Sequence, residues 1–453
     1  MELHEYLDTL SEQIRCKKAR PMIVEEIENH INDQAEAYIK EGMGEEEAVE
    51  KAVLEMGDPV EAGVALDRVH RPRMQWQLVI SAALLCIVGL VMQIIIFKMG
   101  CLSNDTNVTT IRNSFIGNAV LNTFISFAVI AAVCVIDYTF LGRHPIAVWC
   151  TACICLLVYF FIQDFLPFSL NYTFGYYIVT LMTPAFAAVV FCYRGKGWKG
   201  LLKCIALYGV AVFIGIHTLR TAGGIMELSI AVLFILTVSV LRGWFGERKV
   251  GKLALIWIPA AAFPAALIWI AFRLEGGAFL TGYQAARIRS LFIQSEESYQ
   301  VKVIRDALNH ISLFGNKELP LTTLPAIQND YVVTSMLMYF GVAFTVAVLG
   351  IIVYFLWKAF RLSFQQKNRL GSVISLSCVC LLSAKSLIYL FSNIAVFTAF
   401  GQMSMPFLSY GMGNCIVNGV LIGLLLSVYR NTDIVSEKSI KSRYIFRSPI
   451  QKV

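Results

Sequence analysis

The sequence predicts an all-α polytopic membrane protein with ten transmembrane helices, a large ordered outer loop between helices 7 and 8, and a small cytoplasmic helical N-terminal domain. The chain is 57% hydrophobic and 15% charged, whereas soluble proteins have about 45–50% apolar and about 25% charged residues. A mean hydropathy of +0.64 over 453 residues cannot reflect a larger core, because one core stops growing near ~250–300 residues. A water-soluble enzyme, a collagen-like fibre and a disordered protein are therefore excluded.

Residues 1–73 are predicted to form the cytoplasmic helical domain. This stretch is charged, and its apolar residues recur at helical spacing, as Ile23, Ile27 and Ile31 do. Gly57-Asp58-Pro59 interrupts the pattern, and Pro59 suits a first helical turn. No short apolar segment of the kind found in a secretory signal is present, so the N-terminus is expected to stay in the cytoplasm.

Residues 74–430 are predicted to form the membrane domain, and 431–453 a basic cytoplasmic tail. Apolar stretches long enough, or nearly so, to cross ~30 Å of hydrocarbon begin at Trp76. They lie at 76–97, 116–137, 145–162, 175–193, 201–219, 224–241, 253–272, 331–357, 370–392 and 407–429.

The connecting charges orient these helices. Basic residues follow the even-numbered helices and recur in the tail, as at Arg143, Arg194, Arg248 and Lys358, whereas the short loops on the other side carry few. The positive-inside rule places the basic loops in the cytoplasm. An even helix count then predicts that both termini are cytoplasmic.

The connection over residues 273–330 differs from the other, short loops. It is close to sixty residues long and contains apolar and aromatic residues with balanced charge. Long loops in compact proteins are usually functional or disordered. We interpret this outer loop as ordered and folded back onto the helices.

Ionisable residues at membrane depth are costly unless they are paired or face water. His217, Arg220, Glu227 and Lys385 all fall towards the outer side. They are expected to line a polar cavity beneath the outer loop, or else to pair locally or reach the interface.

Other functional classes lack support in the sequence. The 12 cysteines fall mostly within apolar stretches, where cysteine behaves as a small hydrophobe, so no metal site is expected. The net charge of +7 reflects cytoplasmic loops, and no nucleic-acid partner is expected.

Several short motifs follow one another in the membrane domain. Asp137-Tyr138 comes first, followed by Tyr283-Gln284 with Arg287-Ile288, Tyr299-Gln300, Leu324-Pro325 and Asn329-Asp330-Tyr331. Asn393 and the stretch Pro406–Gly411 come last. In type and order these motifs resemble those of the FtsW/RodA/SpoVE family of bacterial shape, elongation, division and sporulation proteins, which has a PF-x-SYGG signature and an Asn in the helix before it. The resemblance covers roughly residues 76–430.

The resemblance implies a multi-pass protein of the bacterial cell membrane, a peptidoglycan glycosyltransferase that polymerises lipid II into glycan strands at the outer face. It implies lipid II and undecaprenyl diphosphate as ligands and a monofunctional class B penicillin-binding transpeptidase as partner. No cofactor is expected, although a divalent cation bridging the diphosphate would be compatible with the chemistry.

The resemblance also implies the site residues. The family's proposed base, ten residues after the Arg of its YQ-x-x-R motif, falls on Glu297, with Glu296 as the adjacent alternative. The cations assigned to the diphosphate are Arg287, Arg289, Arg220 and Lys385. Other expected substrate-binding residues are Glu227, Tyr283, Gln284, Tyr299, Gln300, Asp330, Ser409 and Tyr410.

Several positions depart from the family pattern. The charged QPSE-x-x-K segment has become the uncharged Tyr177–Pro184, Met338 and Tyr339 stand where an acidic pair is usual, and Met412 replaces the second Gly of the signature. Two further hypotheses therefore stay open. One is a catalytically degenerate scaffold, and the other is a flippase for the lipid-linked precursor.

The N-terminal domain is similar to the short helical prefix domain found before some bacterial permeases. The similarity rests on an amphipathic helix pair followed by the stretch from Gly42 to Pro59. It implies a module that contacts a cytoplasmic protein and carries no catalytic residue; the alternative is a cap that only stabilises the membrane domain.

Overall fold

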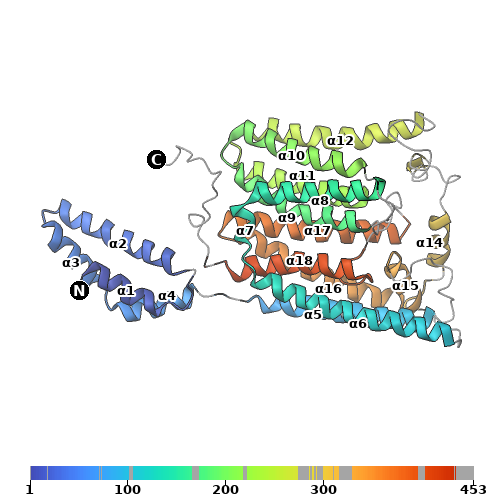
Figure 1. Ribbon diagram of the computed structural model, residues 1–453, viewed down its shortest axis with the longest axis horizontal. Helices are drawn as coiled ribbons and strands as arrows, with labels where there is room; N and C mark the ends of the chain where they lie inside the picture. Colours follow the sequence, from blue (N-terminus) through green and yellow to red (C-terminus); the bar gives the residue numbers. More distant parts are fainter. Residues whose placement is uncertain are drawn as a thin grey trace.

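The computed structural model contains helices and the turns that join them in the part of the chain it describes. The described residues are 2–17, 19–70, 72, 74–100, 106–165, 173–217, 222–273, 285, 288–289, 292, 299–309, 311–315, 329–395, 404–432 and 434. Figure 1 shows a bundle of long helices and, extending from one end of it, a separate group of helices from the N-terminal part of the chain. The predicted all-α class is confirmed.

The first four helices of the chain form the N-terminal module and share their own apolar core. They are α1 (Leu3–Gln13), α2 (Arg20–Lys40), α3 (Glu45–Glu55) and α4 (Pro59–Val69). Asp58 caps α4 by accepting from the backbone N–H groups of Val60 and Glu61, both at 3.3 Å. Tyr6, Leu10 and Ile31 are completely buried in this core.

Ten described helices are long and apolar enough to span a membrane, as the sequence predicts. They are α5 (Trp76–Gly100), α6 (Thr106–Val135), α8 (Pro145–Phe165), α9 (Thr173–Cys192), α10 (Gly197–His217), α11 (Ala222–Leu241), α12 (Lys249–Arg273), α16 (Gly341–Phe364), α17 (Arg369–Asn393) and α18 (Met412–Arg430). The short α7 (Thr139–Arg143) joins α6 to α8. The chain is therefore a multi-pass membrane protein.

Helices α9 and α17 form the centre of the bundle. Within the most apolar stretch of each helix, 78% of α9 and 83% of α17 is buried inside the protein, whereas only 6% of α12 is buried. Ser375, Ser377 and Ser386 of α17 can be buried at close helix contacts, because their hydroxyls donate to carbonyls of their own helix, as Ser377 Oγ does to Ile374 O at 2.6 Å. Helix α12 consequently presents most of its surface to lipid.

The prediction of one helix over 331–357 is wrong, because the chain breaks at Gly341. Helix α15 (Val332–Tyr339) ends just before it, and the spanning helix α16 begins there. Gly341 has φ +79°, and a Cβ on it would lie 2.3 Å from the backbone N of Gly315. The first turn of α16 is then tied to the outer loop, since Val342 N donates to Ser312 O and Ala343 N to Leu313 O, both at 3.2 Å.

Part of the outer loop is an amphipathic helix, α14 (Tyr299–Asn309), at the end of the bundle opposite the N-terminal module (Figure 1). Val301, Ile304 and Ala307 recur at intervals of three residues and are 5%, 1% and 6% exposed. Ile304 and Ala307 belong to the core of the bundle. The expected folding of the loop onto the helices therefore holds for this described segment.

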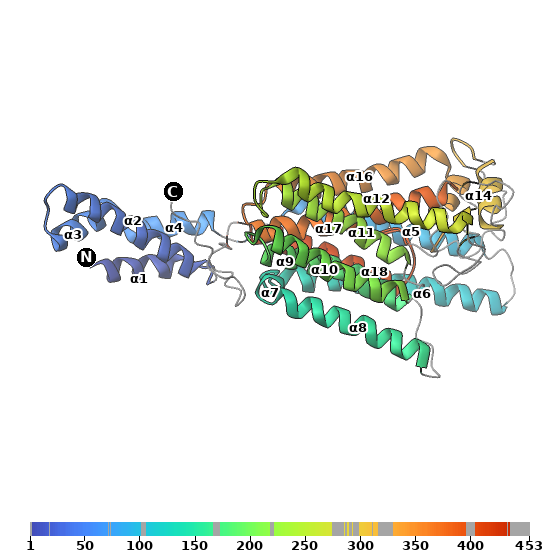
Figure 2. The ribbon, with the colours of Figure 1, turned by 90° about the horizontal axis from the view of Figure 1, so that it is seen from above.

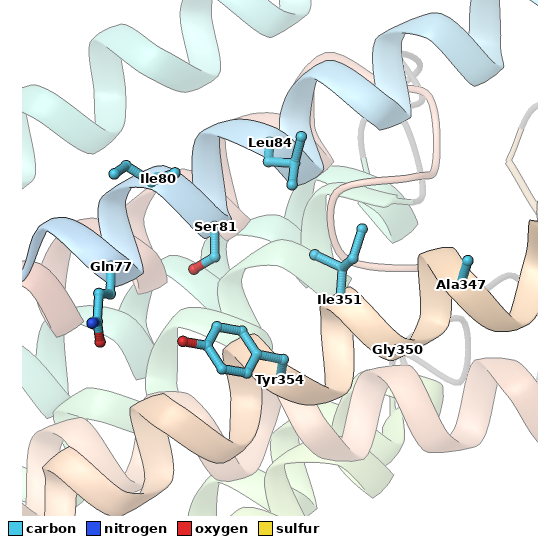
Figure 3. A pocket seen from close by; sticks show the side chains of 8 residues that line it. All are labelled: Gln77, Ile80, Ser81, Leu84, Ala347, Gly350, Ile351 and Tyr354. Atoms are coloured by element: carbon cyan, nitrogen blue, oxygen red, sulfur yellow. The ribbon is translucent and has the colours of Figure 1, made fainter.

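A groove of about 500 Å³ lies between α5 and α16. Figure 3 shows the Ser81 and Tyr354 hydroxyls directed into it, with Gln77 beside them and Ile80, Leu84 and Ile351 around them. Ile80 is 63% and Leu84 44% exposed, so the groove opens to the lipid-facing surface. None of its lining side chains is an acid or an amine.

Candidate active site

The signature segment is a tight turn held by neighbouring backbone. Phe407 lies in the left-handed region at φ +70°. Gly89 of α5 lets the turn approach, because a Cβ there would lie 2.1 Å from Phe407 O. One helical turn along α5, Gln93 Nε2 donates to Leu408 O at 2.9 Å. Only glycine fits at position 89, so α5 fixes the place of the signature.

Ser409 connects the signature to the end of the outer loop. Its Oγ accepts from Met405 N and donates to Asn329 O, each at 2.8 Å. Asn414 of α18 reaches the same residue, since its Nδ2 donates to Asn329 Oδ1 at 3.4 Å. The two family motifs that contain Ser409 and Asn329 are thus joined directly, although 80 residues separate them.

Asn393, at the end of α17, holds the start of α15. Its Nδ2 donates to Asp330 O at 3.0 Å, and its Oδ1 accepts from Thr334 N at 3.1 Å. Tyr389, one turn earlier, donates its hydroxyl to Asn329 O at 2.8 Å and accepts from Val332 N at 2.9 Å. These bonds determine where the chain leaves the outer loop for the bundle.

Asp330 is a half-buried carboxyl within this network. Its Oδ1 is buried and has no hydrogen-bond partner. Burial raises the pKa of Asp330 to about 7, because the charged form loses solvation. A carboxyl with that pKa can carry or release a proton near neutral pH.

Beneath this network lies a second polar cluster that contains Glu227 and Lys385, both completely buried. The Tyr176 hydroxyl contacts the Glu227 carboxylate, with distances of 2.9 and 3.0 Å to its two oxygens. Lys385 Nζ donates to Asn418 Oδ1 at 3.3 Å and lies 5.2 Å from the centroid of the Tyr176 ring. Four helices, α9, α11, α17 and α18, meet at this point.

The two clusters belong to one polar column inside the bundle. Lys385, Tyr389 and Asn393 follow one another at intervals of four residues on α17, as Asn414 and Asn418 do on α18. Four residues correspond to about one helical turn, so Lys385 lies about 12 Å along the axis from Asn393. The column reaches from the ends of the helices near Asn329 into the apolar interior.

The structure brings several expected site residues together. Asp330 and Ser409 both contact the network around Asn329 and Asn393, and Glu227 and Lys385 meet at Tyr176. Tyr410 packs edge-on to Phe97 at 5.4 Å and to Phe115 at 6.0 Å between ring centroids. Arg289 is half-buried in the outer loop.

Other expected site residues lie outside the described residues: Glu296, Glu297, Arg287, Arg220, Tyr283 and Gln284. The backbone of Tyr299 and Gln300 forms the first turn of α14. The roles of all these residues stay predictions. Among the described residues, no group of His, Cys, Asp or Glu is arranged to hold a metal ion.

Tyr176, Asn414 and Asn418 were not foreseen as functional residues. Each is a polar side chain within an apolar membrane helix: Tyr176 in α9, and Asn414 and Asn418 in α18. The cost of burying such groups unpaired was the signal that could have found them. Asparagine has no titratable group, so a search for ionisable residues passes over Asn414 and Asn418. Tyr176 is neutral near pH 7 and is passed over in a search for charged residues.

Comparison with known proteins agrees with this architecture. The model of the FtsW/RodA/SpoVE family, described as cell cycle protein, matches residues 178–434. A probable peptidoglycan glycosyltransferase FtsW of Thioalkalivibrio sp. (strain K90mix) is 28% identical over 123 residues, which cover 26% of this chain and 30% of that protein. Its counterpart in Alcanivorax borkumensis is 25% identical over 201 residues, 42% and 51% of the two chains. The alignments thus span about half the length of these relatives or less.

Solved structures share the fold over a larger part of the chain. A structure described as showing coordination of polymerization and crosslinking by a peptidoglycan synthase complex has a TM-score of 0.58 at 15% identity, covering 79% of this chain and 98% of that one. A mutant of the rod shape determining protein RodA of Thermus thermophilus has a TM-score of 0.51 at 14% identity, with the same coverage. Since the family model covers more than half of the 453 residues, the chain belongs to the FtsW/RodA/SpoVE family of cell cycle proteins.

Proposed function

We propose that this protein is a peptidoglycan glycosyltransferase that polymerises lipid II into glycan strands at the outer face of the bacterial cell membrane. The observation that carries the proposal is the hydrogen bond from Ser409 Oγ to Asn329 O, 2.8 Å long. It joins the signature turn to the end of the outer loop, which is the segment expected to carry the catalytic base. The names of the curated relatives support the same activity.

The reaction requires a base, cations and access from the lipid. The acceptor sugar's hydroxyl oxygen attacks the anomeric carbon of the donor, the bond to the diphosphate oxygen breaks with its electron pair, and the base takes the hydroxyl proton. We assign Glu297 as the base, with Glu296 as the alternative. Cations stabilise the charge that develops on the departing undecaprenyl diphosphate.

The cations we assign to the diphosphate are Arg287, Arg289 and Arg220, because a guanidinium binds phosphate oxygens in pairs. Lys385 is completely buried and already bonded to Asn418. Its direct contact with the diphosphate stays a prediction, and its described contacts favour a role in positioning the helices. No cofactor is part of the proposal.

Purified protein in lipid nanodiscs with fluorescent lipid II tests the assignment. Glu297→Gln should abolish formation of glycan strands, while Glu296→Gln, the matched neighbour, should retain it. Both variants should insert and unfold at the same temperature as the original chain. If both polymerise lipid II equally well, the assignment of the base is wrong.

A transpeptidase is the partner we propose. One structurally similar protein is part of a peptidoglycan synthase complex, and a monofunctional class B penicillin-binding transpeptidase would cross-link the strands that this chain makes. Co-purification of the two tagged proteins after mild detergent extraction tests the pairing. Their separation under those conditions would contradict it.

A scaffold role is the second candidate. It is favoured by the absence of charge in the Tyr177–Pro184 segment of α9 and by Met338 and Tyr339 in α15, where the family usually has charged residues. Cells carrying Glu297→Gln distinguish the roles. A scaffold would support growth with that substitution, whereas an essential polymerase would not.

A further inference from the structure

Ile434 is the last residue that the structure describes. It lies just beyond the end of α18 and packs into the N-terminal module. Its side chain is 3% exposed and belongs to the apolar core of α1–α4. Its backbone N donates to Asn431 O at 3.2 Å, which continues the turn that ends α18. The C-terminal segment therefore contacts the module four residues after Arg430.

The helices of the module are bonded to one another, and the module is acidic. Helix α1 is tied to α4, since Arg15 N donates to Asp67 Oδ1 at 2.9 Å, and to the end of α3, since the Tyr6 hydroxyl donates to Met56 O at 3.3 Å. Residues 1–73 contain 18 of the 31 acidic residues of the chain and only 9 of its 38 Lys and Arg residues. The formal charge of the module is thus −9.

Many of these acids lie on the module's surface. Exposed carboxylates occur on α2 at Glu25, Glu26, Asp33 and Glu36, and on α3 at Glu45, Glu46, Glu47 and Glu50. Anionic lipids of the cytoplasmic leaflet repel such a surface. Figure 2 shows the module extending away from the bundle along the direction of its helices, not lying across their ends.

The chain that follows Ile434 has the opposite charge. Residues 435–453 contain five Lys and Arg residues, Lys438, Lys441, Arg443, Arg447 and Lys452, and one acid, Glu437. Nineteen residues reach up to about 60 Å when extended, and the 21 residues of α2 span about 30 Å. The tail is long enough to follow the module from its point of attachment.

We propose that the acidic N-terminal module is the docking surface for the chain's own C-terminal tail. Ile434 is the apolar anchor, and the basic residues of 435–453 lie against the exposed carboxylates of the module. The first and last cytoplasmic segments of the protein then form one unit beneath the bundle. A cytoplasmic protein that uses the same surface has to displace the tail.

Limited trypsin digestion of the full-length protein tests this docking. The protein is placed in nanodiscs of zwitterionic lipid at about 50 mM salt, where charge pairs are weakly screened. Cleavage after Arg443 and Arg447 is measured by mass spectrometry, relative to cleavage after Arg143, an exposed residue at the end of α7. Ile434→Asp should speed tail cleavage at least fivefold, and so should Lys438→Glu combined with Lys441→Glu.

Val250→Asp, at a residue that is 82% exposed, is the matched control and should leave the relative rate unchanged. Raising the salt to about 500 mM should speed tail cleavage in the original chain. Equal cleavage rates in the original chain, Ile434→Asp and the double charge variant would overturn the proposal. Protection of the tail only in nanodiscs with anionic lipid would also overturn it, because the tail would then bind the membrane.

Discussion

Glu227 and Lys385 place two ionisable groups inside the bundle, where each depends on the other and on neutral polar neighbours. Both are completely buried, and Tyr176 and Asn418 satisfy part of their hydrogen bonding. The family's charged segment is uncharged in α9, and here α11 and α17 supply an acid and a base beside Tyr176 of that helix. The pair is thus a candidate replacement for charges lost from α9.

Removing one partner should cost more than removing both. Lys385→Met leaves Glu227 without a nearby cation and should lower the free energy of unfolding by about 3–5 kcal/mol. The double variant Glu227→Gln with Lys385→Met should recover most of that loss. Unfolding temperatures in one detergent measure the cycle, and a double variant as unstable as the sum of the singles would show that the two residues act independently.

Asp330 should make stability depend on pH. Its pKa rises from the ordinary value of 3.8 to about 7 on folding, so the folded state binds the proton more tightly than the unfolded state. The resulting stability is present below about pH 4 and is lost as the pH rises to about 7, by at most about 4 kcal/mol. Asp330→Asn should flatten the plot of melting temperature against pH between about pH 4 and about pH 7. An unchanged plot would show that Asp330 is not the group responsible for this pH dependence.

At the scale of elements, the contact between α5 and the signature turn depends on the missing side chain of Gly89. Gly89→Ala would place a Cβ 2.1 Å from Phe407 O, and backbone must then move, at a cost of about 1–3 kcal/mol. Gly117→Ala on α6 is the matched control, because nothing lies within 4 Å of its Cβ position. Melting temperatures should fall for the first variant and not for the second.

Helix α14 should act as the anchor of the outer loop. Ile304→Asn would bury an unpaired amide where Ile304 is 1% exposed, so the helix should detach and lipid II polymerisation should fall at least tenfold. Lys302→Asn, on the exposed face of the same helix, should retain activity. Full activity of the Ile304→Asn protein would show that catalysis does not need the outer loop to be anchored by α14.

At the scale of the whole molecule, the sequence predicted the ten spans because apolar length alone determines them. It could not predict the break at Gly341, which depends on close backbone contact with Gly315, a residue 26 positions earlier. For the site, charge identified Glu227 and Lys385, and motif spacing identified Asn393 and Ser409. Their neutral partners Tyr176 and Asn418 depended on how four helices pack, which no local pattern encodes.

We predict the orientation of the whole molecule from the basic residues at one end of the bundle. There Arg194 lies 3.7 Å from the centroid of the Phe191 ring, Lys196 4.7 Å from Tyr193 and Lys252 5.3 Å from Trp198. The N-terminal module extends from this end in Figure 1. Because basic loops are retained in the cytoplasm, both termini should be cytoplasmic.

Reporter fusions measure this orientation in cells. Alkaline phosphatase, which is active only outside the cytoplasm, should be inactive when fused after Arg430 or after Arg248 and active when inserted between residues 316 and 328. Green fluorescent protein fused after Val453 should fluoresce. Phosphatase activity after Arg430 would invert the arrangement and would put the network of Asn329, Asn393 and Ser409 on the cytoplasmic side, away from any glycan strand.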